Sequence, residues 1–169
     1  VKKYLDEFLM DPRVIDVPKW ARILLVRGII LNTRPKKSAE AYQKIWWEEG
    51  SPLIVLSERL QEKVKNNVTI PVALAMRYGS MTLQKGLQDL VDQGVNDVLV
   101  VPLYPQFAMA TTETIDVKVA ELQKEYFPDL EITSLPAFYN KPDYIKVLSD
   151  SISEKIKNLD LSIYGYNLA

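Results

Sequence analysis

Hydrophobic residues in the second half of the chain alternate between short continuous runs and longer stripes with helical spacing. The runs cover residues 70–76, 98–101, 131–135 and 161–164, and helical stripes over 83–91, 111–126 and 142–157 lie between them. The run Val98 to Val101 is too short for a helix and too continuous for a half-exposed strand, which predicts a strand buried on both faces. The alternation predicts an α/β fold, Rossmann-like, with a mostly parallel sheet of about four strands flanked by helices.

The first half of the chain has only helical patterns, separated by polar breaks. They predict helices over residues 1–10, 20–31, 38–49 and 52–65, with a polar loop over 32–37 and Ser38 as a cap. The predicted inward-facing residues of the last two helices are Tyr42, Ile45, Trp46, Leu53, Leu56, Leu60 and Val64. We therefore expect residues 1–66 to form a helical lid and residues 67–169 the α/β core, together one domain.

The amino-acid composition limits which partners, cofactors and catalytic groups the chain can use. The chain has 169 residues, of which 47% are hydrophobic and 25% charged, as in an ordinary soluble domain. Its 21 basic and 22 acidic residues leave a net charge of -1, which disfavours a nucleic-acid partner. The absence of cysteine excludes an iron–sulfur cluster and fits a cytoplasmic location. The absence of histidine removes the commonest general base and transition-metal ligand.

One apolar stretch, WARILLVRGIIL over residues 20–31, has the composition to meet a membrane. It is about half the length of a spanning helix, which needs about 20 residues, and Arg22 and Arg27 interrupt it. The simpler interpretation is a buried or surface helix. The alternative is peripheral membrane contact, by a helix that lies in the interface and admits a lipid-soluble substrate.

Candidate binding residues follow two of the predicted strands. Arg77 and Tyr78 come after the run 70–76, and Tyr104 and Gln106 come after the run 98–101. The carboxyl ends of parallel strands meet at one edge of a sheet, where ligands bind. Aromatic rings and one arginine at this edge would suit a flat, hydrophobic, anionic ligand. The alternative is that the aromatics only close the core. Glycine-rich phosphate loops are absent, so a nucleotide cofactor is disfavoured.

Four stretches of the chain resemble the N-terminal half of the ferrochelatases, the enzymes that insert ferrous iron into a porphyrin late in haem biosynthesis. They are YLDEFLMDPRVIDVP at 4–18, RPKKSAEAYQKIWWEEGSPL at 34–53, AMRYGSMTLQKGL at 75–87 and VPLYPQFAMATTET at 101–114, and they occur in the family's order. The resemblance implies two similar Rossmann-like halves with the porphyrin in the cleft between them. We expect this chain to be a fragment that supplies the first half, with the second half as its partner.

The resemblance also places nine candidate substrate-binding residues. A first group matches positions near the macrocycle and its propionates: Arg34, Lys36, Lys37, Tyr42 and Ser51. Arg77 and Tyr78 match positions near the metal-side opening, and Tyr104 and Gln106 match the cleft wall. The alternatives are a solvated loop for the three cations and a helix cap for Ser51.

The chain also departs from the family. Where the family has a strand that ends in histidine-glycine, residues 159–165 read LDLSIYG, and the glutamate of the second half is absent too. We therefore expect no catalytic residue, no bound cofactor and no metal site in this chain, and no activity of this piece alone. Ferrous iron and a porphyrin, either protoporphyrin IX or coproporphyrin III, would be substrates of the parent lyase. The alternatives are a non-catalytic porphyrin-binding or scaffold domain of the same fold, and a cobalt or nickel chelatase.

Overall fold

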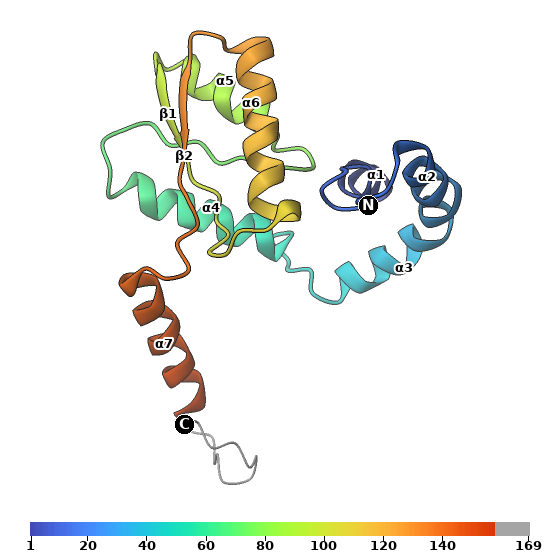
Figure 1. Cartoon of the computed structure of the whole chain (residues 1–169). Coiled ribbons are helices and arrows are strands. Elements are labelled where there is room, and N and C mark those ends of the chain that lie inside the picture. Colours follow the sequence, from blue (N-terminus) through green and yellow to red (C-terminus); the bar gives the residue numbers. More distant parts are fainter. Residues whose placement is uncertain (158–169) are drawn as a thin grey trace. The chain divides into compact units, whose positions relative to one another are not determined.

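The computed structural model describes residues 1–157, which form helices and one small parallel sheet (Figure 1). The elements are α1 (Lys2–Leu9), α2 (Lys19–Ile23), η1 (Leu24–Ile30), α3 (Leu31–Gln43), α4 (Pro52–Lys65), α5 (Leu83–Val91), β1 (Asp97–Val100), η2 (Met109–Glu113), α6 (Thr114–Tyr126), β2 (Glu131–Ser134) and α7 (Pro142–Ile156), where η denotes a π-helix. They fall into two units. The first contains residues 1–102 and 108–135, and the second contains residues 103–107 and those from 136 onward.

The sheet of the first unit is a parallel pair with a helical crossover. β1 and β2 lie side by side, with Asp97 opposite Glu131 and Val100 opposite Ser134, and α6 runs between them in the chain (Figure 1). The pairing extends by one bond beyond each end, from the Glu131 amide to the Asn96 carbonyl and from the Leu135 amide to the Val100 carbonyl. This strand, helix and parallel strand confirm the predicted α/β fold.

The core of this unit lies between the sheet and two helices. Its buried members come from α5, β1, α6 and the turn after α6: Leu87, Leu90, Val98, Leu122, Phe127 and Leu130. Leu87 and Leu90 belong to the predicted helical stripe, because residues three apart share a face of an α-helix. The Thr82 side chain accepts a hydrogen bond from the Lys85 amide at 3.2 Å and so begins α5 at the place where the stripe starts.

The predicted sheet of about four strands is too large, since the described residues form a sheet of two. Residues 70–76 form no strand and pair only through a single bridge between Met76 and Thr82. Pro71 has no amide hydrogen to donate, and the Val72 carbonyl accepts from the Gln61 side chain instead of a neighbouring strand. The segment packs against α5, where Gly86 permits close approach: a Cβ there would lie 3.0 Å from the Ala75 Cβ. The strand predicted at 161–164 lies outside the described residues.

The prediction that β1 is buried on both faces is also wrong. Val98 is buried, whereas Leu99 is 58% exposed and Val101 is exposed as well. Helices α5 and α6 cover one face of the pair, so alternate residues of β1 are buried. A continuous apolar run therefore does not by itself show that both faces of a strand are covered.

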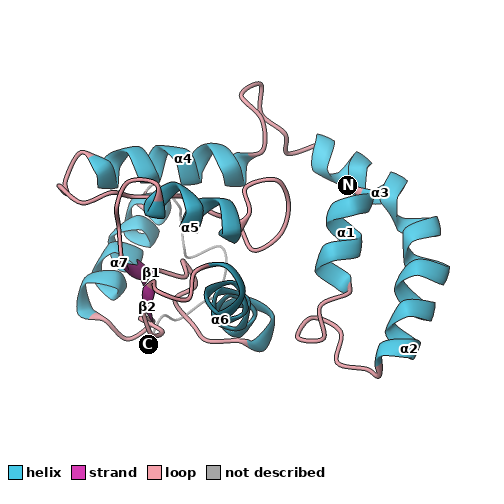
Figure 2. Cartoon of the chain, turned by 90° about the horizontal axis from the view of Figure 1, so that it is seen from above, coloured by secondary structure: helices cyan, strands magenta, loops and turns pink. Residues whose placement is uncertain are grey.

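Residues 19–43 form one helical run, drawn without an intervening loop in Figure 2. The predicted helix over 20–31 is confirmed, but the predicted loop over 32–37 and the cap at Ser38 are wrong. The Asn32 side chain donates to the carbonyls of Arg27 and Gly28, and the Thr33 hydroxyl donates to the carbonyl of Ile29. These side chains bond to the preceding turn of the same helix, which continues through Pro35.

Helix α4 has the predicted bounds but not the predicted buried face. Its stripe of Leu53, Leu56, Leu60 and Val64 is exposed, and the helix buries Val55 instead. The predicted inward residues before it, Tyr42, Ile45 and Trp46, are exposed too. Helical periodicity indicates which residues share a face, but the neighbours that cover a face come from elsewhere in the chain.

Candidate functional site

The most buried charged group in the first unit is the carboxylate of Asp11, which follows the end of α1 and is 2% exposed. Its Oδ2 accepts hydrogen bonds from Arg77 Nη2 at 2.6 Å, from the Tyr78 hydroxyl at 3.0 Å and from the Thr114 hydroxyl. Its Oδ1 accepts from the Arg13 amide at 2.9 Å. Four donors thus replace the water that this carboxylate loses on folding.

Arg77 bridges Asp11 to the start of α6. Its Nε donates to the Thr114 carbonyl at 2.9 Å and to the Thr114 hydroxyl at 2.8 Å. Its guanidinium lies 4.4 Å from the centre of the Tyr78 ring, a cation–π distance. Among the described residues Nη1 has no hydrogen-bond partner, and the side chain is 21% exposed. The guanidinium is therefore fixed on three sides and has one donor group left over.

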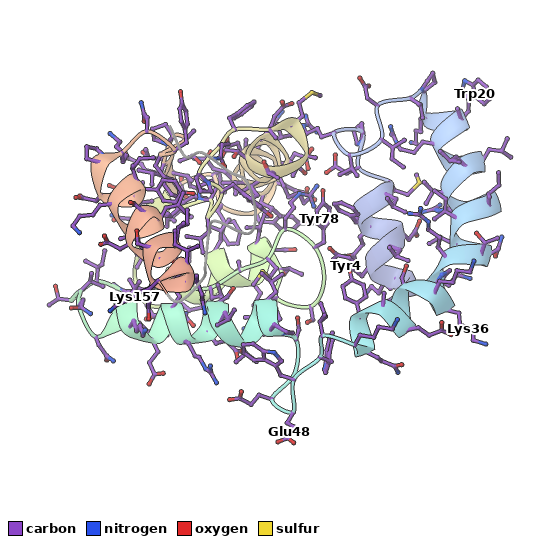
Figure 3. The ribbon with its side chains drawn as sticks, turned by 90° about the horizontal axis from the view of Figure 1, so that it is seen from below. Tyr4, Trp20, Lys36, Glu48, Tyr78 and Lys157 are labelled. Carbon is purple, nitrogen blue, oxygen red and sulfur yellow. The ribbon has the colours of Figure 1, made fainter. Side chains whose placement is uncertain are left out.

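The turn that contains Arg77 and Tyr78 is also held by α1. The rings of Phe8 and Tyr4 meet the Tyr78 ring edge-on, with centroids 5.3 Å and 6.4 Å away, and Figure 3 shows Tyr4 next to Tyr78. The Gly79 amide donates to Glu7 Oε2 at 3.0 Å. Gly79 has φ of 99°, a backbone conformation that residues with a Cβ rarely adopt. Each residue of the turn from 77 to 79 thus has a partner in the N-terminal segment.

A second ion pair links the N-terminal segment to the residue before α6. It lies beside the group formed by Asp11, Arg77, Tyr78 and Thr114, the Asp11 cluster. Arg13 Nε donates to Glu113 Oε1 at 3.0 Å, and both side chains are partly exposed. Neither side chain contacts Arg77 or Tyr78 through a hydrogen bond. The pair therefore joins the two segments without orienting the turn.

Burial and hydrogen bonding oppose each other at Asp11. Burial raises the pKa of the Asp11 carboxyl, but the hydrogen bonds from Thr114, the Arg13 amide and Tyr78, together with the charge of Arg77, outweigh it, so the pKa lies below its ordinary value of 3.8. For the Tyr78 hydroxyl, the causes that raise the pKa outweigh those that lower it. Burial is the largest cause that raises its pKa above 10.0, against the lowering effects of Thr114 and Arg77. Asp11 is therefore ionised and Tyr78 neutral near pH 7.

The five residues predicted near the macrocycle lie elsewhere in the first unit. Arg34, Lys36 and Lys37 are exposed on α3, as Figure 3 shows for Lys36, and Tyr42 is exposed near the end of that helix. Ser51 occupies the N-cap position of α4, but its side chain makes no capping hydrogen bond. The cations therefore stand on a helix rather than in the expected loop.

Tyr104 and Gln106 belong to the second unit, and both are exposed. The residue between them, Pro105, accepts hydrogen bonds from the amides of Phe138 and Tyr139 at 3.0 Å and 2.9 Å. The loop is thus fixed to the segment that precedes α7. That Tyr104 and Gln106 share one edge with Arg77 and Tyr78 stays a prediction.

The sequence analysis missed Asp11 and Thr114. Asp11 is separated from Arg77 by 66 positions and from Thr114 by 103, so no local pattern connects them. A signal did exist. Asp11, the Arg77 turn and Thr114 each lie in one of the four stretches that carry the family resemblance, and the structure brings three of those stretches together in this cluster.

Comparison with known proteins identifies the family. The ferrochelatase family model matches residues 1–164. The chain belongs to the ferrochelatase family. Among its curated relatives, the ferrochelatases of Pseudomonas paraeruginosa (strain DSM 24068 / PA7) and Ectopseudomonas mendocina (strain ymp) are each 47% identical to it over 170 residues. That of Pseudomonas fluorescens (strain Pf0-1) is 44% identical. Each match covers 98% of this chain, and the chain spans about half the length of these relatives.

The described part of this ferrochelatase-family chain contains neither a group of potential metal ligands nor a helix that could span a membrane. Over residues 1–157, acidic side chains do not gather in groups of three that would hold a metal ion. Over the same range, no helix combines the length and the apolar composition needed to cross a bilayer. The Asp11 carboxylate is held instead by the side chains of an arginine, a tyrosine and a threonine.

Proposed function

We propose that this chain supplies one side of the porphyrin cleft of a lyase that inserts ferrous iron into protoporphyrin IX or coproporphyrin III. Iron and porphyrin are then substrates, and the rest of the cleft comes from a partner half. The observation that carries the proposal is the 47% identity to ferrochelatases over 98% of the chain. Such identity extends through all four stretches that first suggested the family.

The direct test is a metal-insertion assay on the intact gene product that carries these 169 residues. Loss of the free-porphyrin absorption bands on addition of ferrous iron under anaerobic conditions is the expected result, with each of the two porphyrins tested separately. Porphyrin binding without insertion of iron would instead support the alternative, a non-catalytic porphyrin-binding domain. Insertion of cobalt or nickel but not iron would point to a chelatase for another metal.

The 169 residues alone are expected to lack this activity. Metal insertion removes two pyrrole protons, which needs a base with a pKa near neutrality, and the chain contains no histidine. The lowered pKa of Asp11 makes that carboxylate a poor substitute, because it holds protons weakly and its lone pairs are already bonded. Iron or zinc insertion by the isolated chain would contradict this expectation.

The helical placement of the three cations refines how they would bind the porphyrin propionates. Arg34 and Lys37 are three positions apart on α3 and share a face, whereas Lys36 is two positions from Arg34 and faces another way. We expect Arg34 and Lys37 to act together on one carboxylate. Arg34→Ala with Lys37→Ala should therefore weaken porphyrin binding more than Lys36→Ala does, measured by quenching of tryptophan fluorescence. Equal effects of the two changes would argue against a shared carboxylate.

Peripheral membrane contact through residues 20–31 is the proposed route for a lipid-soluble porphyrin. Trp20, Leu24 and Ile29 are exposed along α2 and η1, which gives this run an apolar outer side. The two arginines of this run are each bonded within the protein, although the Arg27 side chain is 56% exposed. Arg22 is buried and donates to the carbonyls of Ile15 and Val17, and Arg27 pairs with Asp6. Exposed apolar side chains next to a basic residue are the combination that interfacial helices use.

Liposome flotation of the intact gene product tests this contact with a matched control. Leu24 and Leu53 are each 65% exposed, but Leu53 lies on α4. Leu24→Asp should reduce the fraction that floats with the vesicles, while Leu53→Asp should leave it unchanged. If both variants float like the wild type, the contact is not made through this run. The proposed location is the cytoplasm, with peripheral attachment to a membrane.

A further inference from the structure

We infer that Asp11 and Thr114 are positioning residues for metal insertion: they hold the Arg77 guanidinium and the Tyr78 hydroxyl in one fixed orientation at the substrate. The inference rests on the proposed function and adds two residues to it. Asp11 accepts hydrogen bonds from both side chains of the turn, at 2.6 Å and 3.0 Å; the Thr114 hydroxyl accepts from Arg77 Nε at 2.8 Å and lies 3.2 Å from the Tyr78 hydroxyl. No other described residue has a polar atom within hydrogen-bond distance of both side chains.

The way Arg77 is held distinguishes a binding group from a purely structural ion pair. Its Nε and Nη2 are used inside the protein, while Nη1 has no partner among the described residues and the side chain keeps 21% of its exposure. A planar guanidinium anchored by two of its nitrogens cannot rotate, so the direction of the remaining N–H groups is fixed. Donors that are already fixed and unpaired need no reorganisation when a substrate arrives.

Besides fixing Arg77 in place, the Asp11 carboxylate neutralises its positive charge, which matters for a cationic substrate. An unpaired arginine near the path of a ferrous ion would repel it. The Asp11 carboxylate lies 2.6 Å from the guanidinium and is ionised, since Arg77 and three hydrogen bonds stabilise its charged form. The pair is therefore neutral as a whole, and Arg77 can serve as a hydrogen-bond donor without a net positive field.

The hydroxyl of Thr114 allows the test to be made without changing a charge. Thr114→Val keeps the shape of the side chain and removes the hydroxyl, and Thr114→Ser keeps the hydroxyl. Glu113→Gln is the matched control, because it breaks the ion pair to Arg13 that joins the same two segments and leaves Arg77 and Tyr78 untouched. Asp11→Asn is the second variant in the cluster.

In the intact gene product we expect Thr114→Val and Asp11→Asn to lower kcat about 10- to 100-fold, the size of effect that a small misplacement of a binding group produces. The Kd for the metal-free porphyrin should stay within about twofold, because fixing this turn serves the insertion step rather than macrocycle binding. Thr114→Ser should restore kcat to within about threefold of the wild type, and Glu113→Gln should change it less than about twofold.

Two results would overturn the inference while the proposed function stands: wild-type kcat in Thr114→Val, or equal losses of kcat in Thr114→Val and Glu113→Gln. A parallel loss of kcat and porphyrin affinity in Thr114→Val would also overturn it, because general loosening of the fold affects both. A wild-type protein that inserts no metal would contradict the proposed function itself. The two failures are therefore told apart by the wild-type assay alone.

Discussion

Replacing Thr114 with valine gives a quantitative test of how much the Asp11 cluster contributes to stability. Thr114 is 2% exposed, and its hydroxyl donates to the Asp11 carboxylate and accepts from Arg77 Nε. A hydrogen bond to a charged group contributes about 1.5–3 kcal/mol. Losing the hydrogen bond from Arg77 Nε to the hydroxyl costs little, because Arg77 Nε still donates to the Thr114 carbonyl at 2.9 Å. We expect Thr114→Val to lower the free energy of unfolding by about 2–3 kcal/mol.

Thr112 provides the control for this substitution. It is 4% exposed and lies two residues earlier, but its hydroxyl has no hydrogen-bond partner among the described residues. Thr112→Val removes a buried polar group that nothing satisfies, so we expect it to be neutral or stabilising.

Urea unfolding of the intact gene product, followed by circular dichroism, measures both variants. With a slope of about 2 kcal/mol per molar urea, Thr114→Val should lower the midpoint by about 1 M, and Thr112→Val should not lower it. Equal decreases in the two midpoints would refute the reasoning, because the cost would then come from the shape of valine rather than from the lost hydrogen bonds.

Three further predictions use the same unfolding assay. Leu122→Ala, in the core between α6 and the sheet, should cost about 2–5 kcal/mol, whereas Leu99→Ala, at a 58% exposed position on β1, should cost less than about 1 kcal/mol; similar costs would place the core elsewhere. Gly79→Ala should cost about 1–2 kcal/mol because φ there is 99°, and an unchanged midpoint would show that the turn relaxes. The pKa of Asp11 is below 3.8 in the folded protein, so the stability that its ionised form adds is present above about pH 4 and disappears as the pH falls through the folded pKa. The difference in stability between the wild type and Asp11→Asn should therefore shrink below about pH 4, and a constant difference down to pH 2 would contradict the assignment.

The sequence by itself determined the type of most elements and the family. Helices α4, α5 and α7 and strands β1 and β2 lie within a few residues of the predicted ranges, because helical stripes and short apolar runs are both patterns of neighbouring side chains. The motifs at 75–87 and 101–114 pointed to the ferrochelatases, since a motif is also local. Each of these features depends on residues that are neighbours in the chain and not on tertiary contacts.

The tertiary structure decided which faces are covered and where charges are buried. Leu53 belongs to a correctly predicted helical stripe and is nevertheless exposed, because no described element covers that face of α4. The environment of Asp11 depends on partners 66 and 103 positions away. Whether a carboxylate is buried is set by the donors that folding brings to it, and the sequence around Asp11 contains only one of them, the amide of Arg13.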